Sequence, residues 1–400
     1  MSPAGPKRLA GSPSLLRAIN ERAVFEYLLE QGPLTRAGVA KLAGLSTPTA
    51  SSALTRLHAQ GLITPVGETS GRPGRNATLY TVQPAIALVA AVEVTPRSLT
   101  SVVCDVSGQV RARSRQVVPN GVGAADAVAG ALDDVCQQAG LSPGALTRVQ
   151  LAVPGSYDAA NDAIRYVSHL PGWSRPGIVG GLRDRLHPTR VDVDNDVNLA
   201  AIAERSRGVA GHADWFALFW VSRGLGLAVD LGGSPLRGAR GGAGEIGYMP
   251  VGLPGRGPAG HKLQSLVGAA AVRALASEHG LRGRTAGLVV RRAVDSGGTG
   301  RAFLRELAER IAVGLAAVIA VLDPPLVVLA GEVCQAGGTT LRDLIVRALV
   351  RSSGFDSPVV VTGVEGNPVL LGAIDAVVAG ARAELVATLG ERAGPSALPR

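Results

Sequence analysis

Residues 33–76 read PLTRAGVAKLAGLSTPTASSALTRLHAQGLITPVGETSGRPGRN, and this stretch decides the fold expected for the N-terminal part of the chain. Thr35 is suited to cap a helix, and Gly44 stands where a helix C-terminus favours a residue that tolerates positive φ. Ser46 is suited to cap a second helix, with Pro48 in the first turn, where its missing N–H costs nothing. The stretch therefore predicts two helices joined by a short turn.

The second predicted helix has an apolar stripe and a polar outer face. Ala50, Ala53, Leu54 and Leu57 recur at helical spacing and form the stripe. The outer face carries short donors and one arginine, which can approach phosphates and base edges in a DNA major groove. An ordinary solvated face is the alternative for one helix taken alone. The candidate DNA-contacting residues on this helix are Thr47, Pro48, Thr49, Ser51, Ser52 and Arg56.

A basic, glycine-rich hairpin follows the second helix. Strand-like residues 62–64 and 79–82 flank a loop that carries Arg72 and Arg75. An arginine on a slim loop suits a narrow minor groove, although a solvated hairpin tip would look similar. With an amphipathic helix over 15–29, these elements predict a winged helix-turn-helix at residues 14–85. Its expected partner is a double-stranded DNA operator.

Composition agrees with this prediction. The chain has 400 residues and a formal net charge of +9, and residues 1–80 hold nine basic and four acidic residues. The basic excess partly reflects coding bias, because only three of the basic residues in the whole chain are lysines. The three cysteines are scattered, which favours buried thiols over a disulfide framework or a zinc site.

The ends of the chain and its apolar runs predict a soluble location. Residues 1–14 lack the apolar core of a signal peptide, and the longest apolar run, 311–329, is broken by Asp323-Pro324-Pro325. We expect a cytoplasmic protein with no membrane partner. Residues 1–13 are rich in Pro, Gly and Ser and are expected to be disordered, and residues 391–400 to form a flexible tail.

From residue 86 the pattern changes to strands that alternate with helices, with glycine turns at strand ends. This pattern predicts an α/β fold that binds ligands at the carboxyl ends of its strands. The expected strands cover 86–94, 99–104, 149–153, 191–193, 215–221, 225–231, 326–329 and 359–362. The expected helices cover 124–139, 198–205, 265–278, 302–322 and 370–387.

Three motifs in this region resemble the ROK family (repressor, open reading frame, kinase), specifically its regulator branch. They are Leu170-Pro171-Gly172-Trp173, Val193-Asp194-Asn195-Asp196-Val197-Asn198-Leu199-Ala200-Ala201 and Gly241-Gly242-Ala243-Gly244-Glu245-Ile246-Gly247-Tyr248. The resemblance covers about residues 14–387. It implies a multidomain chain in which the winged helix-turn-helix precedes an α/β actin-like (ribonuclease H-like) sugar-kinase fold of two lobes over 86–390.

The resemblance also implies a ligand site. In the family's sugar kinases the aspartate at the position of Asp196 is the general base, and the residues matching Asn195 and Glu245 hold other sugar hydroxyls. Tyr248 stands at the position of a zinc-binding histidine, and Gln264 at that of another sugar-contacting glutamate. Polyol recognition needs several fixed donors and acceptors. Without the flanking motifs, residues 194–196 would fit a capped strand-to-helix turn equally well.

The departures from the family pattern argue against catalysis. The first phosphate loop has lost both glycines in Val92–Ser98, the second reads Ser222-Arg223-Gly224-Leu225-Gly226, and Glu332 adds a carboxylate on the adenosine side. The cysteine run that binds zinc is replaced by residues 254–262, where His261 alone cannot form a tetrahedral site. We therefore expect no cofactor, no metal and no catalytic residue.

The sequence favours a transcriptional regulator, a repressor of carbohydrate-related genes whose C-terminal domain senses a sugar or sugar derivative. An active sugar kinase with a DNA-binding appendage is the main alternative. A regulator whose C-terminal domain serves only for dimerisation is a third. The resemblance implies a homodimer or homotetramer.

Overall fold

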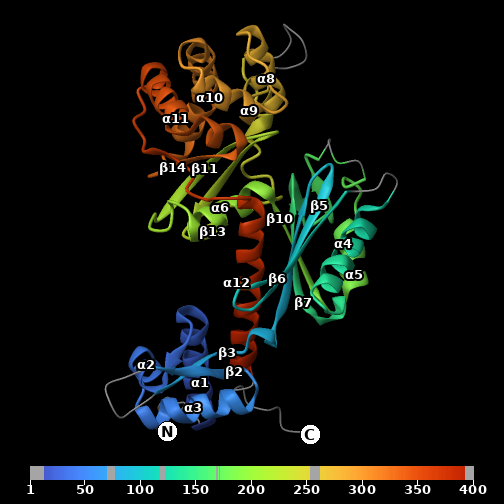
Figure 1. Ribbon diagram of the computed structural model, residues 1–400, viewed down its shortest axis with the longest axis vertical. Coiled ribbons are helices and arrows are strands. Elements are labelled where there is room, and N and C mark those ends of the chain that lie inside the picture. Colours follow the sequence, from blue (N-terminus) through green and yellow to red (C-terminus); the bar gives the residue numbers. More distant parts are fainter. Residues whose placement is uncertain are drawn as a thin grey trace, which may run out of the picture.

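The computed structural model describes residues 13–69, 77–117, 122–167, 170, 172–252 and 262–391. The chain forms a small N-terminal part and two larger α/β lobes (Figure 1). One long helix, α12 (Pro368–Glu391), runs from the junction of the two lobes to the N-terminal part. The candidate site depends on how these three parts meet.

The N-terminal part consists of three helices and a small sheet with the strand order β1-β3-β2. The elements are α1 (Pro13–Gln31), β1 (Leu34–Thr35), α2 (Arg36–Leu42), α3 (Thr47–Ala59), β2 (Ile63–Thr69) and β3 (Ala77–Val82). The predicted caps are confirmed, since the Thr35 hydroxyl accepts from the Gly38 N–H at 3.1 Å and the Ser46 hydroxyl from the Thr49 N–H at 3.3 Å. The predicted apolar stripe of α3 is buried, which leaves the polar face of that helix pointing outward.

The first lobe contains a five-stranded sheet with the order β10-β7-β4-β5-β6. The strands are β4 (Leu88–Val94), β5 (Ser98–Asp105), β6 (Val110–Val117), β7 (Leu146–Val153) and β10 (Arg190–Asn195). Helices α4 (Ala124–Gln138) and α5 (Ile178–Leu186) cover one face through a cluster that includes Leu132 and Leu151. The short elements are η1 (Pro84–Ile86), η2 (Pro143–Ala145), β8 (Ser156–Asp158) and β9 (Ala163–Arg165).

The second lobe contains a sheet with the order β13-β12-β11-β14-β15. The strands are β11 (Trp215–Val221), β12 (Leu225–Leu231), β13 (Ser234–Pro235), β14 (Val327–Ala330) and β15 (Val359–Val361). One face is covered by a helical layer that buries Phe219 and Phe303. Its helices are η3 (Ile246–Tyr248), α7 (Gln264–Val267), α8 (Ala269–Glu278), α9 (Ala286–Asp295), α10 (Gly298–Leu322) and α11 (Gly331–Ser353).

The two sheets have the same topology. In each, three antiparallel strands are followed by two strands that add parallel to the first. Helix α6 (Asp196–Arg207) packs on the second sheet, and α12 packs on the first sheet and on α6. A β-carbon at Gly372 of α12 would lie 1.7 Å from the Leu199 carbonyl oxygen of α6, so this contact requires glycine. The two lobes therefore share a tightly packed middle layer.

Several helices differ from the prediction. The single helix expected over 265–278 is two helices, because the backbone at Gly268 is extended, with ψ of 161°. Helices α5, α9 and α11 were not expected. Helix α11 contains the pair Gly337-Gly338, which in a sequence resembles a turn more than a helix. The backbone is indeed kinked there, since Gly338 has φ of 51°.

The N-terminal part and α12 share one hydrophobic cluster. Val24 and Phe25 of α1 lie in it with Val386 and Leu389 of α12. The predicted boundary at residue 85 falls in η1, yet the last turns of the chain return to the N-terminal part. Pro13 and Glu391 were expected in flexible ends but belong to α1 and α12, and residues 1–12 and 392–400 lie outside the described residues.

The cysteines are buried thiols, as predicted: Cys104, Cys136 and Cys334 are all free and inaccessible. Burial raises the pKa of Cys334 to about 12, so this thiol stays protonated. No helix in the described part of the chain is long and apolar enough to cross a bilayer.

Candidate functional site

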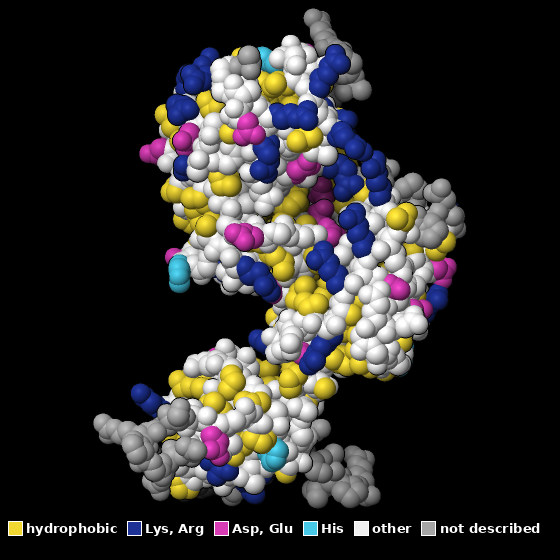
Figure 2. All heavy atoms as spheres, viewed as in Figure 1, with side chains coloured by type: hydrophobic (Ala, Val, Ile, Leu, Met, Phe, Trp, Pro, Cys, Tyr) yellow, Lys and Arg dark blue, Asp and Glu magenta, His cyan; other side chains and the backbone are white. Residues whose placement is uncertain are grey.

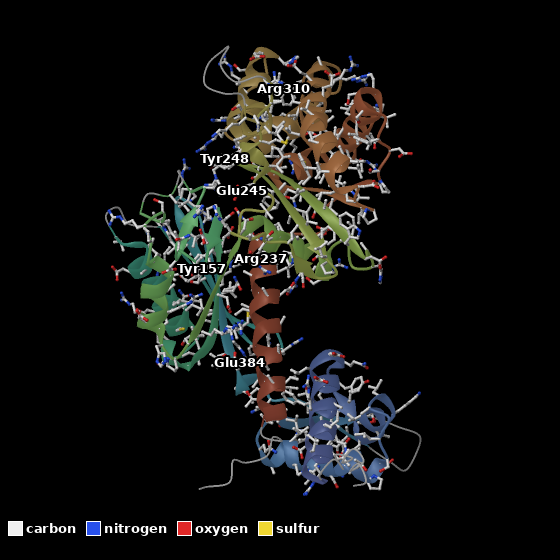
Figure 3. The ribbon with its side chains drawn as sticks, turned by 180° about the vertical axis from the view of Figure 1, so that it is seen from behind. Tyr157, Arg237, Glu245, Tyr248, Arg310 and Glu384 are labelled. Atoms are coloured by element: carbon white, nitrogen blue, oxygen red, sulfur yellow. The ribbon has the colours of Figure 1, made fainter. Side chains whose placement is uncertain are left out.

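A cavity of about 560 Å³ lies between the two lobes, within the size range of small-molecule sites. Acidic side chains lie in the furrow between the lobes and basic ones along its rim (Figure 2). Glu245 and Tyr248 lie where the lobes face each other (Figure 3). All five predicted ligand-contacting residues line this one cavity: Asn195, Asp196, Glu245, Tyr248 and Gln264.

Asn195 joins the end of β10 to the start of α6. Its Oδ1 accepts from the N–H groups of Val197 at 2.7 Å and Asn198 at 3.3 Å, and its Nδ2 donates to the Gly155 carbonyl at 3.0 Å. The capping role considered for this turn is therefore real. One N–H of the Asn195 amide has no partner in the described part of the chain, and it is the part of the side chain left for a ligand.

Asp196 follows directly, at the wall of the cavity. Its Oδ1 accepts from the Val197 N–H at 2.9 Å. Burial raises the pKa of this carboxyl to about 7, the Val197 N–H opposes the shift, and the nearby carboxylate of Glu245 adds to it. At neutral pH both protonation states are populated, so the carboxyl can accept from or donate to a hydroxyl group.

Glu245 reaches the cavity through a turn that only glycine allows. Gly244 has φ of 86°, and a β-carbon there would lie 1.8 Å from the Leu227 carbonyl oxygen. Oε1 of Glu245 accepts from the Ser156 hydroxyl of the first lobe at 2.8 Å. Burial raises the pKa of Glu245, and the Ser156 hydrogen bond opposes this shift.

Glu93 is a third cavity carboxyl, and the sequence did not identify it as a site residue. It lies on β4, and its Oε2 accepts from Asn367 Nδ2 at 2.6 Å. Burial raises its pKa, and Asn367 opposes the shift. The Oδ1 of Asn367 also accepts from the Leu370 N–H at 3.1 Å. A cavity carboxyl is thus tied directly to the first turn of α12.

Gln264 lines the cavity, and its amide also bonds to a neighbouring loop. Its Oε1 accepts from the Leu225 N–H at 2.7 Å, and its Nε2 donates to the Arg223 carbonyl at 3.2 Å. The side chain lines the cavity, but its amide holds the loop between β11 and β12. Its effect on a ligand would therefore pass through the position of Arg223.

Tyr248, at the position of the family's zinc histidine, makes aromatic and cation contacts. Its ring lies 4.8 Å from that of Tyr166, centroid to centroid, and the Lys262 Nζ lies 4.7 Å from its centroid. Tyr248 remains 41% exposed. Since Tyr166 comes from the first lobe, the ring pair spans the mouth of the cavity.

Polar contacts also join the lobes beside the cavity. Arg237 of the second lobe donates to Asp194 of the first at 2.6 Å, in addition to the bond between Ser156 and Glu245. Arg237 and Glu245 both face this junction in Figure 3. The cavity is therefore enclosed by contacts that must break if the lobes open.

The loop at residues 95–98, which matches the first phosphate loop of family kinases, is closed on itself. The Thr95 N–H donates to the Ser98 carbonyl and the Ser98 N–H to the Thr95 hydroxyl, both at 3.0 Å, and Pro96 has no N–H. The Glu332 carboxylate accepts from the Gly287 N–H at 3.1 Å, at the start of α9. The N–H groups of Thr95, Ser98 and Gly287 are therefore engaged within the chain and are not free to hold a nucleotide phosphate.

No group of three or more His, Cys, Asp or Glu side chains that could hold a metal ion occurs in the described residues. The run 254–261, where the family places its cysteines, lies outside them. The expectation of no metal stays a prediction.

The outward face of α3 has the polar character that the sequence predicted. Thr47, Pro48 and Ser52 are exposed, and Thr49 and Ser51 are partly exposed. Arg56 is different, because its Nε donates to Glu21 of α1 and the side chain is only partly exposed. Arg72 and Arg75 lie outside the described residues.

Cavity-lining residues that were missed include Tyr166, Arg223 and Lys262, and Ser156, which bonds to Glu245, was missed as well. Arg223 lies in residues 222–226, which match a phosphate loop of the family, so its charge could have marked it as a site residue. Tyr166 had none, since its place depends on the positive φ of 62° that follows β9.

The chain is thus a two-lobed α/β protein with a carboxyl-lined cavity between its lobes. Residues 89–378 match the ROK family, and the chain belongs to this family.

Known relatives of the chain include transcriptional regulators. It is 20% identical over 390 residues to the xylose repressor of Caldicellulosiruptor bescii, a match that covers 92% of this chain and 97% of that protein. It is 24% identical over 259 residues to the transcriptional dual regulator NagC of Escherichia coli, covering 63% of this chain and 62% of NagC. A crystal structure of a ROK family transcriptional regulator, a homologue of E. coli Mlc, aligns with a TM-score of 0.71 at 18% identity, covering 94% of this chain and all of that one. At this identity, the similarity to the solved regulator structure shows a shared fold and nothing more.

Proposed function

We propose that this chain is a DNA-binding transcriptional regulator, a repressor of carbohydrate-related genes, in which a catalytically inactive sugar-kinase-like domain senses an effector. The observation that carries the proposal is that α12 joins a carboxyl-lined cavity to the helices that present α3. The relatives named as repressors support the same function.

In this proposal residues 14–85 form a winged helix-turn-helix and 86–390 an actin-like domain of two lobes. The α3 contacts to DNA are Thr47, Pro48, Thr49, Ser51 and Ser52, and the wing contacts are Arg72 and Arg75. Arg56 shapes the domain through Glu21 and adds charge near the phosphates. A homodimer or homotetramer in the cytoplasm would match operator half-sites about one helical turn or a multiple apart.

The cavity supplies the sensing. Asp196, Glu245 and the free N–H of Asn195 offer acceptors and a donor for hydroxyl groups, and Tyr248 and Tyr166 offer apolar ring faces at the mouth. A ligand that changes the contacts between the lobes would act on Glu93, and through Asn367 on α12. The coupling expected for such a device is about 1–3 kcal/mol.

The experiment is a DNA-binding assay with and without sugars. A duplex selected by the protein from a random pool is titrated by fluorescence anisotropy, alone and with xylose, glucose, N-acetylglucosamine or their phosphate esters and uronates. We expect salt-dependent binding that at least one compound changes by about 5-fold or more. DNA binding that no compound in this panel alters would leave a regulator without the proposed sensing role, and no DNA binding would overturn the function.

An active sugar kinase is the alternative, and the raised pKa of Asp196 favours it, since a general base works best with a pKa near the working pH. The occupied amides of the turn at Thr95 and Ser98 argue against it. A coupled assay with ATP and the same sugars separates the two. Phosphorylation by the wild type that Asp196→Asn removes would establish the enzyme.

A further inference from the structure

We propose that the effector is an acidic sugar, a polyol carrying a phosphate or carboxylate group, and that Arg223 binds this group. The inference rests on the proposed sensing function and narrows its ligand class. The cavity carboxyls alone would suggest a neutral polyol as the effector, and Arg223 changes this expectation to an acidic one.

Arg223 is a cation facing the acidic wall of the cavity. It lies in the loop between β11 and β12, lines the cavity and is exposed. Burial raises the pKa of Asp196, at the start of α6, and of Glu93, on β4 of the first lobe, and the charge of Arg223 opposes both shifts. The guanidinium therefore acts on the space in which a ligand would lie.

The loop that carries Arg223 is fixed. The Ser222 N–H donates to the Gly224 carbonyl at 2.9 Å, and both ends of the Gln264 amide bond to the loop, at Leu225 N–H and at the Arg223 carbonyl. A side chain on a fixed backbone loses less entropy when it binds a ligand. Gln264 thus serves Arg223 as a positioning residue.

Arg223 is not held in an ion pair with a cavity carboxylate. It forms no ion pair within 4.0 Å in the described residues, whereas Arg148, Arg205 and Arg237 each pair with an aspartate. Lys262 likewise contacts the Tyr248 ring and pairs with no described carboxylate. Two unpaired cations at the cavity leave donors for an anion, and guanidinium binds phosphate or carboxylate with two parallel bonds.

The cavity lining therefore carries two chemically different kinds of group. Asp196 and Glu245 suit hydroxyl groups, while Arg223, from the loop where family kinases bind a nucleotide phosphate, suits an acidic group. A neutral sugar would leave the cation unused, and a simple anion would leave the carboxyls unmatched. An acidic sugar satisfies both kinds of group.

The test compares matched ligands on the full chain by calorimetry. Glucose, mannose, galactose and N-acetylglucosamine are each measured beside their 6-phosphate ester, and the first three also beside their uronate, at constant ionic strength. We expect at least one acidic member to bind about tenfold or more tightly than its neutral parent, since a hydrogen bond to a charged group contributes about 1.5–3 kcal/mol. The phosphate and uronate arms decide which acid is recognised.

Variants separate the role of Arg223 from general charge. Arg223→Gln should bring the ratio of acidic to neutral affinity to about one, while Arg291→Gln, which removes a charge from the outer surface of α9, should leave the ratio unchanged. The melting temperature of each unliganded variant checks folding. If neutral sugars bind as well as their acids, or if Arg223→Gln keeps the preference, the acidic-sugar inference fails while sensing stands. If no compound binds but DNA binding persists, sensing and this inference both fail.

Discussion

Three carboxyl groups from two lobes share one cavity, and burial raises the pKa of each of them. Asp196 is shifted most clearly, to about 7. Because its folded pKa lies above the unfolded value near 4, the folded state holds a proton that the unfolded state releases between these two pH values. Stability is therefore favoured below pH 4 and lost as the pH rises toward and past 7.

Asp196→Asn should remove this loss. We expect the variant to melt about 2 °C above the wild type at pH 8, which corresponds to a gain of about 1 kcal/mol after discounting for solvent screening. At pH 5 the gain should largely disappear, because the wild-type carboxyl is then protonated. Calorimetric melting curves at both pH values measure the difference, and an equal effect at pH 5 and 8 would contradict the assignment.

Among single residues, the sequence predicted those site residues that belong to the motifs at 193–201 and 241–248. Asn195, Asp196 and Glu245 line the cavity because each motif places its side chain locally, at a strand end or a glycine turn. Glu93 and Tyr166 could not be predicted in the same way. Their neighbours in the cavity come from segments far away in the chain, and one sequence carries no signal for such pairs.

At the scale of elements, α3 carries the prediction for DNA. Ser52 is exposed in the middle of its outward face. Ser52→Glu should weaken DNA binding at least tenfold, because a carboxylate there would face phosphates across a short distance. The matched control is Ser277→Glu in α8 of the second lobe, which makes the same substitution at an exposed position away from α3. Anisotropy titrations of both variants decide, and equal affinities would remove α3 from the interface.

The contact between α6 and α12 can be tested with two helical glycines, one in this contact and one on the exposed side of another helix. Gly372→Ala should lower stability by about 1–3 kcal/mol, because its methyl group would meet the rigid Leu199 carbonyl. Gly130→Ala in α4 should be neutral or stabilising, since a β-carbon there meets no atom within 4 Å, and alanine favours helix by about 1 kcal/mol over glycine. Denaturant midpoints compare the two. Equal losses would mean that the helices can part at little cost.

Elements were predicted well where local signals were strong. The caps of α2 and α3 and the bounds of β11 and β12 could be read from capping residues and apolar runs. Helix α11 escaped because three glycines hide its period, and its stability comes from packing against α9 and α10. The shared topology of the two sheets was implied only by the family resemblance, since it depends on strand order and on no repeated sequence.

At the scale of the whole molecule, α12 connects the cavity to the N-terminal part (Figure 1). Asn367→Asp keeps an oxygen for the helix cap but removes the donor to Glu93. We expect DNA affinity without ligand to stay within about twofold, and the response to the effector to fall from about 5–150-fold toward none. Anisotropy with and without the effector found above measures both. A full response in this variant would place the coupling elsewhere.

The shared cluster of α1 and α12 also bears on how such proteins can be recombined. The first and last described helices, α1 and α12, share one core, so a cut near residue 85 would separate Val24 and Phe25 of α1 from Val386 and Leu389. A chimera that grafts this DNA-binding head onto another sensor must carry the final turns of α12 along with it. The part that can be exchanged between such proteins therefore consists of two separate segments of the sequence, one that contains α1 and one that contains the end of α12.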